Sequence, residues 1–74
     1  MMNYVEVYKS VLDFHRKYSS ILNTEEYWDS VVSESDAITR QYDNCRFVRD
    51  LLLAVINELE RKAKEMIKNA DTAV

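Results

Sequence analysis

The tetrapeptide Tyr42-Asp43-Asn44-Cys45 decides the fold of this 74-residue chain. Asp and Asn favour turns and caps over helix interiors, because their short side chains compete for backbone hydrogen bonds. If the chain turns here, the segments on either side form two helices that can pack on each other. If it does not, they fuse into one rod of about 45 residues, roughly 67 Å long, which could bury its apolar stripe only against another chain. We expect a turn.

Outside this tetrapeptide the chain has few other places to turn. It contains no glycine and no proline, and so lacks the residues that most often form turns or interrupt helices. Apolar residues recur at alternating spacings of three and four along most of its length, which is the spacing of one helix face. The pattern therefore predicts helices separated by two short polar breaks.

The segment after the tetrapeptide has the strongest helical pattern. We expect the longest helix over about residues 46–69 and expect it to form the spine of the core. Its apolar stripe consists of Val48, Leu52, Val55, Leu59, Ala63, Met66 and Ala70, flanked by Leu51, Ile56 and Ile67.

The segment before the tetrapeptide, about residues 25–42, predicts a helix with a narrower stripe and an acidic outside. The stripe consists of Trp28, Val31, Val32, Ser35, Ile38 and Tyr42. The candidate acidic face consists of Glu25, Glu26, Asp29, Glu34 and Asp36, with no basic residue until Arg40. Residues 23–44 hold six acids and one base, a sum of −5 in a chain of net charge −3. A solvated face is the ordinary meaning of such a run, and docking of a basic partner is the alternative.

The other break lies at Leu22-Asn23-Thr24. Asn23 is the expected N-cap of the middle helix, with Glu26 reaching back three residues later; Thr24 is the alternative cap. Leu22 and Tyr27 would then form a hydrophobic staple. The first helix is expected over about residues 4–22, with Asn3 as its N-cap.

Three helices joined by short turns predict an all-α, antiparallel up-down-up three-helix bundle, forming a single domain over residues 1–74. The pattern does not determine the handedness of the bundle. A core of this size is marginal without a disulfide or a metal. Since Cys45 is the only cysteine and His15 the only histidine, regular packing and self-association are the remaining sources of stability.

The sequence predicts no catalytic residue, no metal site and no cofactor. His15 has Val11 and Ser19 one turn away on either side, so no helical pair could chelate a metal with it. We interpret His15 as a half-buried core or interface residue, and Cys45 as a small apolar residue rather than a reactive thiol. A cleft lined by His15 and carboxylates would instead favour an enzyme.

Particular residues point to two other functions. Asp29-Ser30-Val31 resembles the phosphopantetheine site of acyl carrier proteins, but Ser30 is expected inside a helix rather than where a loop meets one. Arg46 and Arg49 could place a nucleic-acid-reading helix at the start of the last segment. The net charge of −3 and the acidic middle helix argue against binding to phosphates.

Surplus hydrophobicity is the better indication of function. On a helical wheel Val5 and Leu12 lie beside the main stripe of the first helix, and Phe47, Leu53 and Ala54 lie beside that of the last. A 74-residue monomer has little material to cover them. The candidate interface consists of Val5, Leu12, Phe47, Leu51 and Leu53. We therefore expect a non-enzymatic protein interaction module that forms a homodimer about a two-fold axis, unless long neighbouring side chains cover these positions.

Composition also bears on location. The longest apolar run, residues 51–56, is far short of the roughly 20 residues that cross a bilayer, so no membrane association is expected. The single cysteine, and a start that has neither a basic nor an apolar run, favour the cytoplasm.

Two stretches, Tyr27-Trp28-Asp29-Ser30-Val31-Val32 and the run from Phe47 to Arg61, resemble a group of short, uncharacterised all-helical bacterial proteins, a domain of unknown function. The resemblance covers most of the chain. It implies a bacterial origin, in mobile or phage-derived regions, and it implies no activity and no site.

Overall fold

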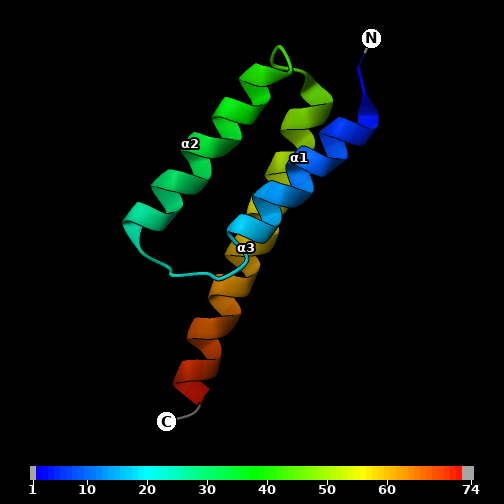
Figure 1. Ribbon diagram of the computed structural model, residues 1–74. Helices are drawn as coiled ribbons and strands as arrows, with labels where there is room; N and C mark the ends of the chain where they lie inside the picture. The colour runs from blue at the N-terminus through cyan, green and yellow to red at the C-terminus, as the bar shows by residue number, and fades with distance from the viewer. Residues whose placement is uncertain (1, 73–74) are drawn as a thin grey trace.

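The computed structural model describes residues 2–72, with the side chains of residues 2–67. It contains α1 (Tyr4–Lys17), α2 (Glu25–Gln41) and α3 (Arg46–Thr72), and no strand among the described residues. Figure 1 shows α2 running opposite to both α1 and α3, so that α1 and α3 point the same way. The predicted all-α, up-down-up three-helix bundle is confirmed.

The turn at Tyr42-Asp43-Asn44-Cys45 is confirmed. Asp43 and Asn44 both have left-handed backbones, with φ of 56° and 57°. The amide of Asp43 donates to the carbonyl of Arg40 at 3.0 Å, and the amide of Asn44 donates to that of Thr39 at 2.9 Å. These two bonds form a Schellman motif, which satisfies carbonyls that the end of α2 would leave unpaired. In a chain without glycine, Asp and Asn take the left-handed positions because they tolerate them better than other residues.

The first helix ends earlier than expected, at Lys17 instead of residue 22. The hydroxyl of Tyr27 donates to the carbonyl of Tyr18, an acceptor that a continuing helix would have used for the amide of residue 22. The hydroxyl of Ser19 donates to the carbonyl of Arg16 at 2.8 Å. Tertiary contacts of the Tyr18 ring and carbonyl thus end α1, and residues 18–24 form a longer connection than the sequence pattern indicated.

The N-cap of α2 is Thr24, the alternative cap, whose hydroxyl accepts from the amide of Tyr27 at 3.1 Å. The expected cap Asn23 is instead left-handed, with φ of 50°, and its side-chain oxygen accepts from the indole of Trp28 at 3.1 Å. The expected staple between Leu22 and Tyr27 is wrong: Leu22 is 71% exposed. By contrast, the predicted cap at Asn3 is confirmed by its bond to the amide of Glu6.

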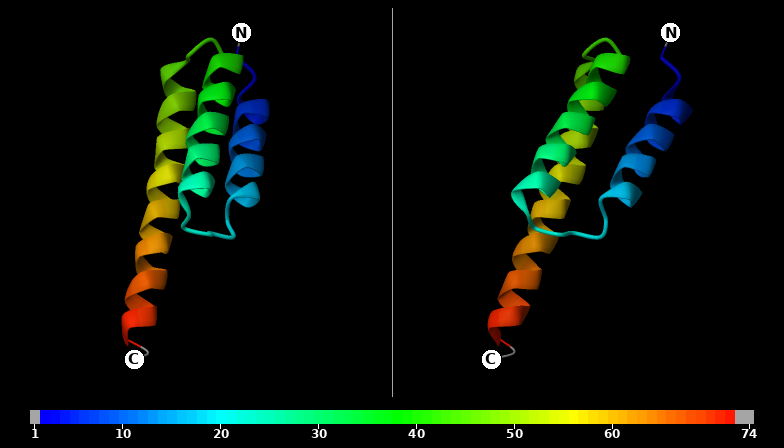
Figure 2. Two further views of the ribbon diagram at one scale, coloured as in Figure 1. Left: turned by 90° about the vertical axis from the view of Figure 1, so that its left-hand side faces the viewer. Right: turned by 60° about the vertical axis from the view of Figure 1, so that its left-hand side comes forward.

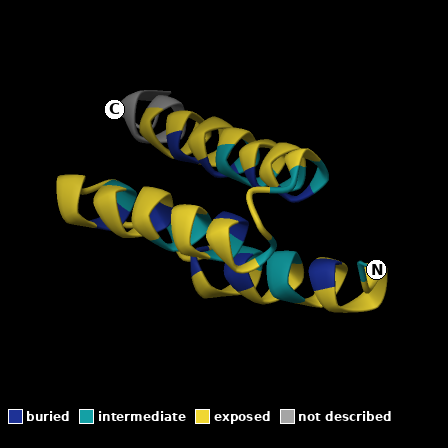
Figure 3. Cartoon of the chain, turned by 90° about the horizontal axis from the view of Figure 1, so that it is seen from above, coloured by how far each residue is buried: buried dark blue, intermediate teal, exposed yellow. Residues whose placement is uncertain are grey.

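The core lies where the three helices face one another, and the buried residues, drawn dark blue in Figure 3, come from all three helices. Its fully buried members are Val7 and Phe14 of α1, Val31 of α2, and Val48, Leu52 and Leu59 of α3. Val32 is an exception to the expected stripe of α2, because it is exposed and Thr39 is buried instead. The Thr39 hydroxyl donates to the carbonyl of Ser35, so its burial leaves no polar group unpaired.

The end of α3 extends beyond the other two helices. Figure 2 shows its last turns continuing past the α1–α2 connection, and α3 ends at Thr72 rather than at about residue 69. No glycine or proline interrupts these turns. The molecule is accordingly elongated, 53 by 21 by 17 Å. None of the described helices has the length and apolar character needed to cross a membrane.

Candidate functional site

The candidate interface residues of α3 meet α1 through aromatic rings. Phe47 lies between Tyr4 and Tyr8, whose ring centroids are 5.6 and 5.9 Å from its own in edge-on geometry. Such pairs are favourable beyond the area that they bury. Phe47 is half-buried, as is Leu51 one turn further along. Both residues therefore already contribute to packing within the single chain.

The candidate interface residues of α1 are open to solvent. Val5 is 77% exposed and Leu12 47% exposed. Both lie on the same side of α1 as Tyr8, three residues before it and four after it. We call the surface formed by Tyr4, Val5, Tyr8, Leu12, Phe47 and Leu51 the α1–α3 face.

Tyr4 and Tyr8 belong to this face and not to the buried core. Both are more than half exposed, at 58% and 56%. Helical spacing alone could not separate them from the stripe, because they border it. The sequence signal that could have indicated their exposure was their position next to Val5, since an apolar neighbour off the stripe widens the apolar surface.

Leu53 does not belong to this face. It lines a small pocket of about 180 Å³ with Ser35, Thr39 and Ile56, on the side of α3 that meets α2. The structure thus brings four of the five candidate interface residues together and places the fifth elsewhere.

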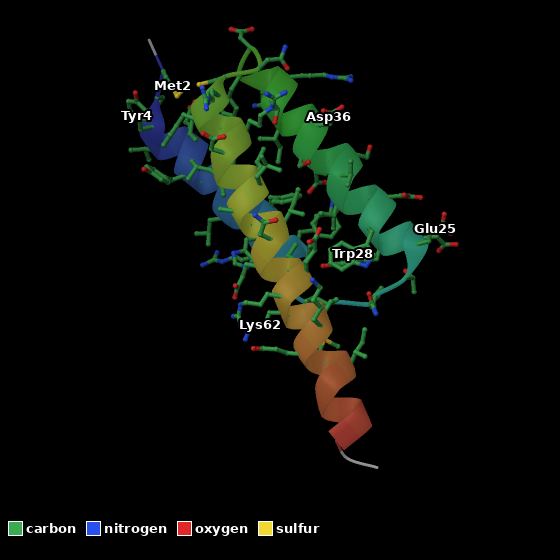
Figure 4. The ribbon with its side chains drawn as sticks, turned by 180° about the vertical axis from the view of Figure 1, so that it is seen from behind. Met2, Tyr4, Glu25, Trp28, Asp36 and Lys62 are labelled. Atoms are coloured by element: carbon green, nitrogen blue, oxygen red, sulfur yellow. The ribbon has the colours of Figure 1, made fainter. Side chains whose placement is uncertain are left out.

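The candidate acidic face is divided between two sides of α2. Figure 4 shows Glu25 and Asp36 on the outer side of the helix, and Asp36 pairs with Arg40 at 3.0 Å. Glu34 instead bridges to Lys17 of α1 at 2.6 Å. This hydrogen bond raises the pKa of Lys17 above its usual value.

The remaining acidic residues are placed as follows. Glu26 lines a pocket with Lys17 and Tyr18 on the α1 side, and Asp29 is exposed. Glu25 and Glu26 also lie in the first turn of α2, where negative charge is favourable near the positive end of the helix dipole. The acidic run therefore serves local stability and offers no single convergent site.

His15 lines a pocket of about 370 Å³ between α1 and α3, together with Ser19, Glu58 and Lys62. This is the kind of cleft that would favour an enzyme. Glu58, however, accepts two hydrogen bonds from Arg61, of 2.9 and 2.8 Å. This bonding lowers the pKa of Glu58 and raises that of Arg61, so Glu58 is a carboxylate committed to an ion pair.

A nucleophile held by a base is also missing from this pocket. The Ser19 hydroxyl donates to the carbonyl of Arg16, and among residues 2–67 no hydrogen bond joins it to His15. Activation of a serine needs such a bond to a base, although hydrogen bonds of this kind often tighten only when substrate is bound. Among the described residues, this pocket therefore contains no hydrogen-bonded pair of nucleophile and base.

Ser30 and Cys45 also have clear placements. Ser30 lies inside α2 and its carbonyl accepts from the hydroxyl of Tyr18 at 3.3 Å, so it is within a helix as expected. Cys45 is half-buried against the core. In the part of the chain described, no three His, Cys, Asp or Glu side chains converge as metal ligands do.

Arg46 and Arg49, the candidate nucleic-acid residues, sit among carboxylates. Arg46 lies 3.9 Å from Asp50, and Arg49 shares a pocket with Asp36. Acidic neighbours weaken the attraction of this end of α3 for phosphates.

Comparison with protein-family models, with curated protein sequences and with solved structures finds no match for this chain.

Proposed function

We propose that this protein is a non-enzymatic helical interaction module that forms a homodimer through its α1–α3 face. The observation that carries the proposal is the exposure of Val5 and Leu12 beside the aromatic cluster at Phe47. A contiguous apolar surface that a monomer leaves in water is typical of an interaction site. Tyrosines at its border are common at interfaces because they combine an apolar ring with a polar tip.

A second copy of the same chain is the simplest partner for this face. Closed two-fold dimers are the commonest soluble oligomers, and they need only one self-complementary surface. The acidic outer side of α2 stays in solvent in such a dimer or meets a basic partner. The lone thiol of Cys45 supports a cytoplasmic setting, and we propose a bacterial one on the resemblance of its sequence.

Sedimentation equilibrium of the purified chain tests this function. The wild type should have the mass of two chains, and the variant Val5→Lys/Leu12→Lys should have the mass of one. Val32→Lys is the matched control, because Val32 is 59% exposed but lies on α2, away from the α1–α3 face. A wild type that remains monomeric at millimolar concentration would refute the proposal.

An enzyme centred on His15 is the second candidate, favoured only by the pocket that His15 shares with Ser19 and Glu58. Model esters and phosphate esters assayed with wild type and His15→Gln test it. Turnover by the wild type that His15→Gln abolishes would support catalysis. Equal background rates in both proteins would remove this candidate.

A further inference from the structure

The register between α1 and α3 can be read from side-chain contacts. Phe47 lies between Tyr4 and Tyr8, so it is level with residue 6. Further along the two helices, Glu58 of α3 shares a pocket with His15 of α1. The two helices point the same way (Figure 1), so a residue of α1 is level with the residue 41 to 43 positions later in α3.

Each of these helices has one outward-facing stripe beside the contact between α1 and α3. On α1 the stripe is Val5, Lys9, Leu12 and Arg16, at spacings of four, three and four, and all four residues are exposed. On α3 the stripe is Phe47, Asp50, Ala54 and Glu58, at spacings of three, four and four, with Asp50 and Ala54 exposed. Both sets fall on one helix face.

The two stripes are complementary at matching levels. Val5 is level with Phe47 and Leu12 with Ala54, which places apolar residues together. Lys9 is level with Asp50 and Arg16 with Glu58, which places basic residues opposite acidic ones. The order of both stripes is therefore the same: apolar, charged, apolar, charged, with opposite signs of charge.

A two-fold axis parallel to the helices would bring the complementary residues of two copies together. Such an axis lays the α1 stripe of each copy over the α3 stripe of the other at the same level, and it does so twice. A two-fold axis perpendicular to the helices would instead lay α1 on α1 in opposite directions. With the axis level with the middle of the α1 stripe, Lys9 would then lie over Leu12 and Arg16 over Val5, so that charged side chains meet apolar ones. Both charged residues of this stripe are basic, so no register gives an ion pair between the two copies of it.

We infer that the second copy binds in parallel, α1 over α3, with Lys9 of each chain paired to Asp50 of the other. The inference rests on the proposed homodimer and adds its geometry and its charge register. Both groups are available: among residues 2–67 Lys9 makes no ion pair, and Asp50 has only the 3.9 Å contact with Arg46. The pairing of Arg16 with Glu58 is secondary, because Arg61 already binds Glu58.

A charge swap tests the pairing. Lys9→Glu alone and Asp50→Lys alone each place like charges opposite one another twice per dimer, and each should raise the dimer dissociation constant on the order of tenfold. The double variant Lys9→Glu/Asp50→Lys restores opposite charges and should return to within about threefold of the wild type. Lys64→Glu and Asp29→Lys, which change the same charges away from the stripes, should leave the constant unchanged.

The outcomes separate this inference from the proposed function. A wild type that dimerises while the single variants bind as tightly as it does would overturn the parallel arrangement but leave the dimer. Weakened single variants without recovery in the double variant would overturn it as well. If a reversal prevents folding, as circular dichroism would show, Lys9→Gln and Asp50→Asn give the same comparison with smaller effects. A monomeric wild type would overturn both proposals.

Discussion

Replacing Asp43 by glycine should stabilise the folded chain. Asp43 has a left-handed backbone with φ of 56°, a conformation that costs an ordinary L-residue about 1–2 kcal/mol. Glycine adopts it freely but loses about 0.5–1 kcal/mol more chain entropy on folding. Asp tolerates this backbone better than most residues, so its own cost lies near the lower end of that range, and the difference favours the variant by up to about 0.5 kcal/mol. The amide of residue 43, which donates to the carbonyl of Arg40, is retained.

Thermal unfolding followed by circular dichroism measures this gain. For a domain of this size, 1 kcal/mol corresponds to about 4–8 °C, so the midpoint should rise by up to about 4 °C at fixed protein concentration. Asp43→Asn removes the charge near the negative end of the α2 dipole but keeps a side chain that tolerates this backbone. It should give only a small part of the rise.

Asp13→Gly is the matched control, because it makes the same chemical change at an exposed position inside α1. There glycine lowers helix propensity, and the variant should lose about 0.3–0.5 kcal/mol. The two substitutions are thus expected to have opposite signs. If Asp43→Gly unfolds at or below the temperature of the wild type, the left-handed turn is not the conformation that ends α2.

Three further predictions concern the core and the ion pairs. Phe14 is 1% exposed, and Phe14→Ala should cost about 3–5 kcal/mol, enough to leave the chain largely unfolded by circular dichroism at 25 °C. Tyr27→Phe should cost about 1 kcal/mol in urea unfolding at pH 8, because it removes the hydrogen bond to the Tyr18 carbonyl. Burial raises the pKa of Tyr27 above its ordinary value near 10, so its stabilisation is complete below pH 10 and is lost as the pH rises through the folded pKa. The wild type should therefore lose its advantage over Tyr27→Phe in alkali, and a constant difference at all pH values would contradict this. Lys17→Met breaks an exposed pair with Glu34 and should lower stability slightly at low salt and not at all at 1 M NaCl.

Much of the fold could be predicted because its signals are local. The cap at Asn3, the turn at Asp43 and Asn44, and the periodicity of α3 each depend on residues within one or two turns of each other. These signals placed three helices in order, and short connections then made neighbours antiparallel. The end of α1 was not predictable in this way, since it depends on Tyr27 reaching the carbonyl of Tyr18 from another helix.

The candidate site was predictable only in part. Val5 and Leu12 could be found because they lie off the main stripe of their own helix. Leu53 met the same criterion, yet it lies beside α2, because a wheel shows direction around one helix and not which neighbour lies there. The family resemblance, the dimer and the absence of enzymatic activity stay predictions.

The amino-acid sequence by itself determined the number, order and approximate extent of the helices, because backbone hydrogen bonds, caps and apolar periodicity act over a few residues. The tertiary structure alone decided which apolar side chains stay in water and which charged residues lie level with one another. Those properties depend on the register of α1 against α3, which is set where the ring of Phe47 packs between those of Tyr4 and Tyr8. Contacts between residues about forty positions apart leave no periodic trace in the chain.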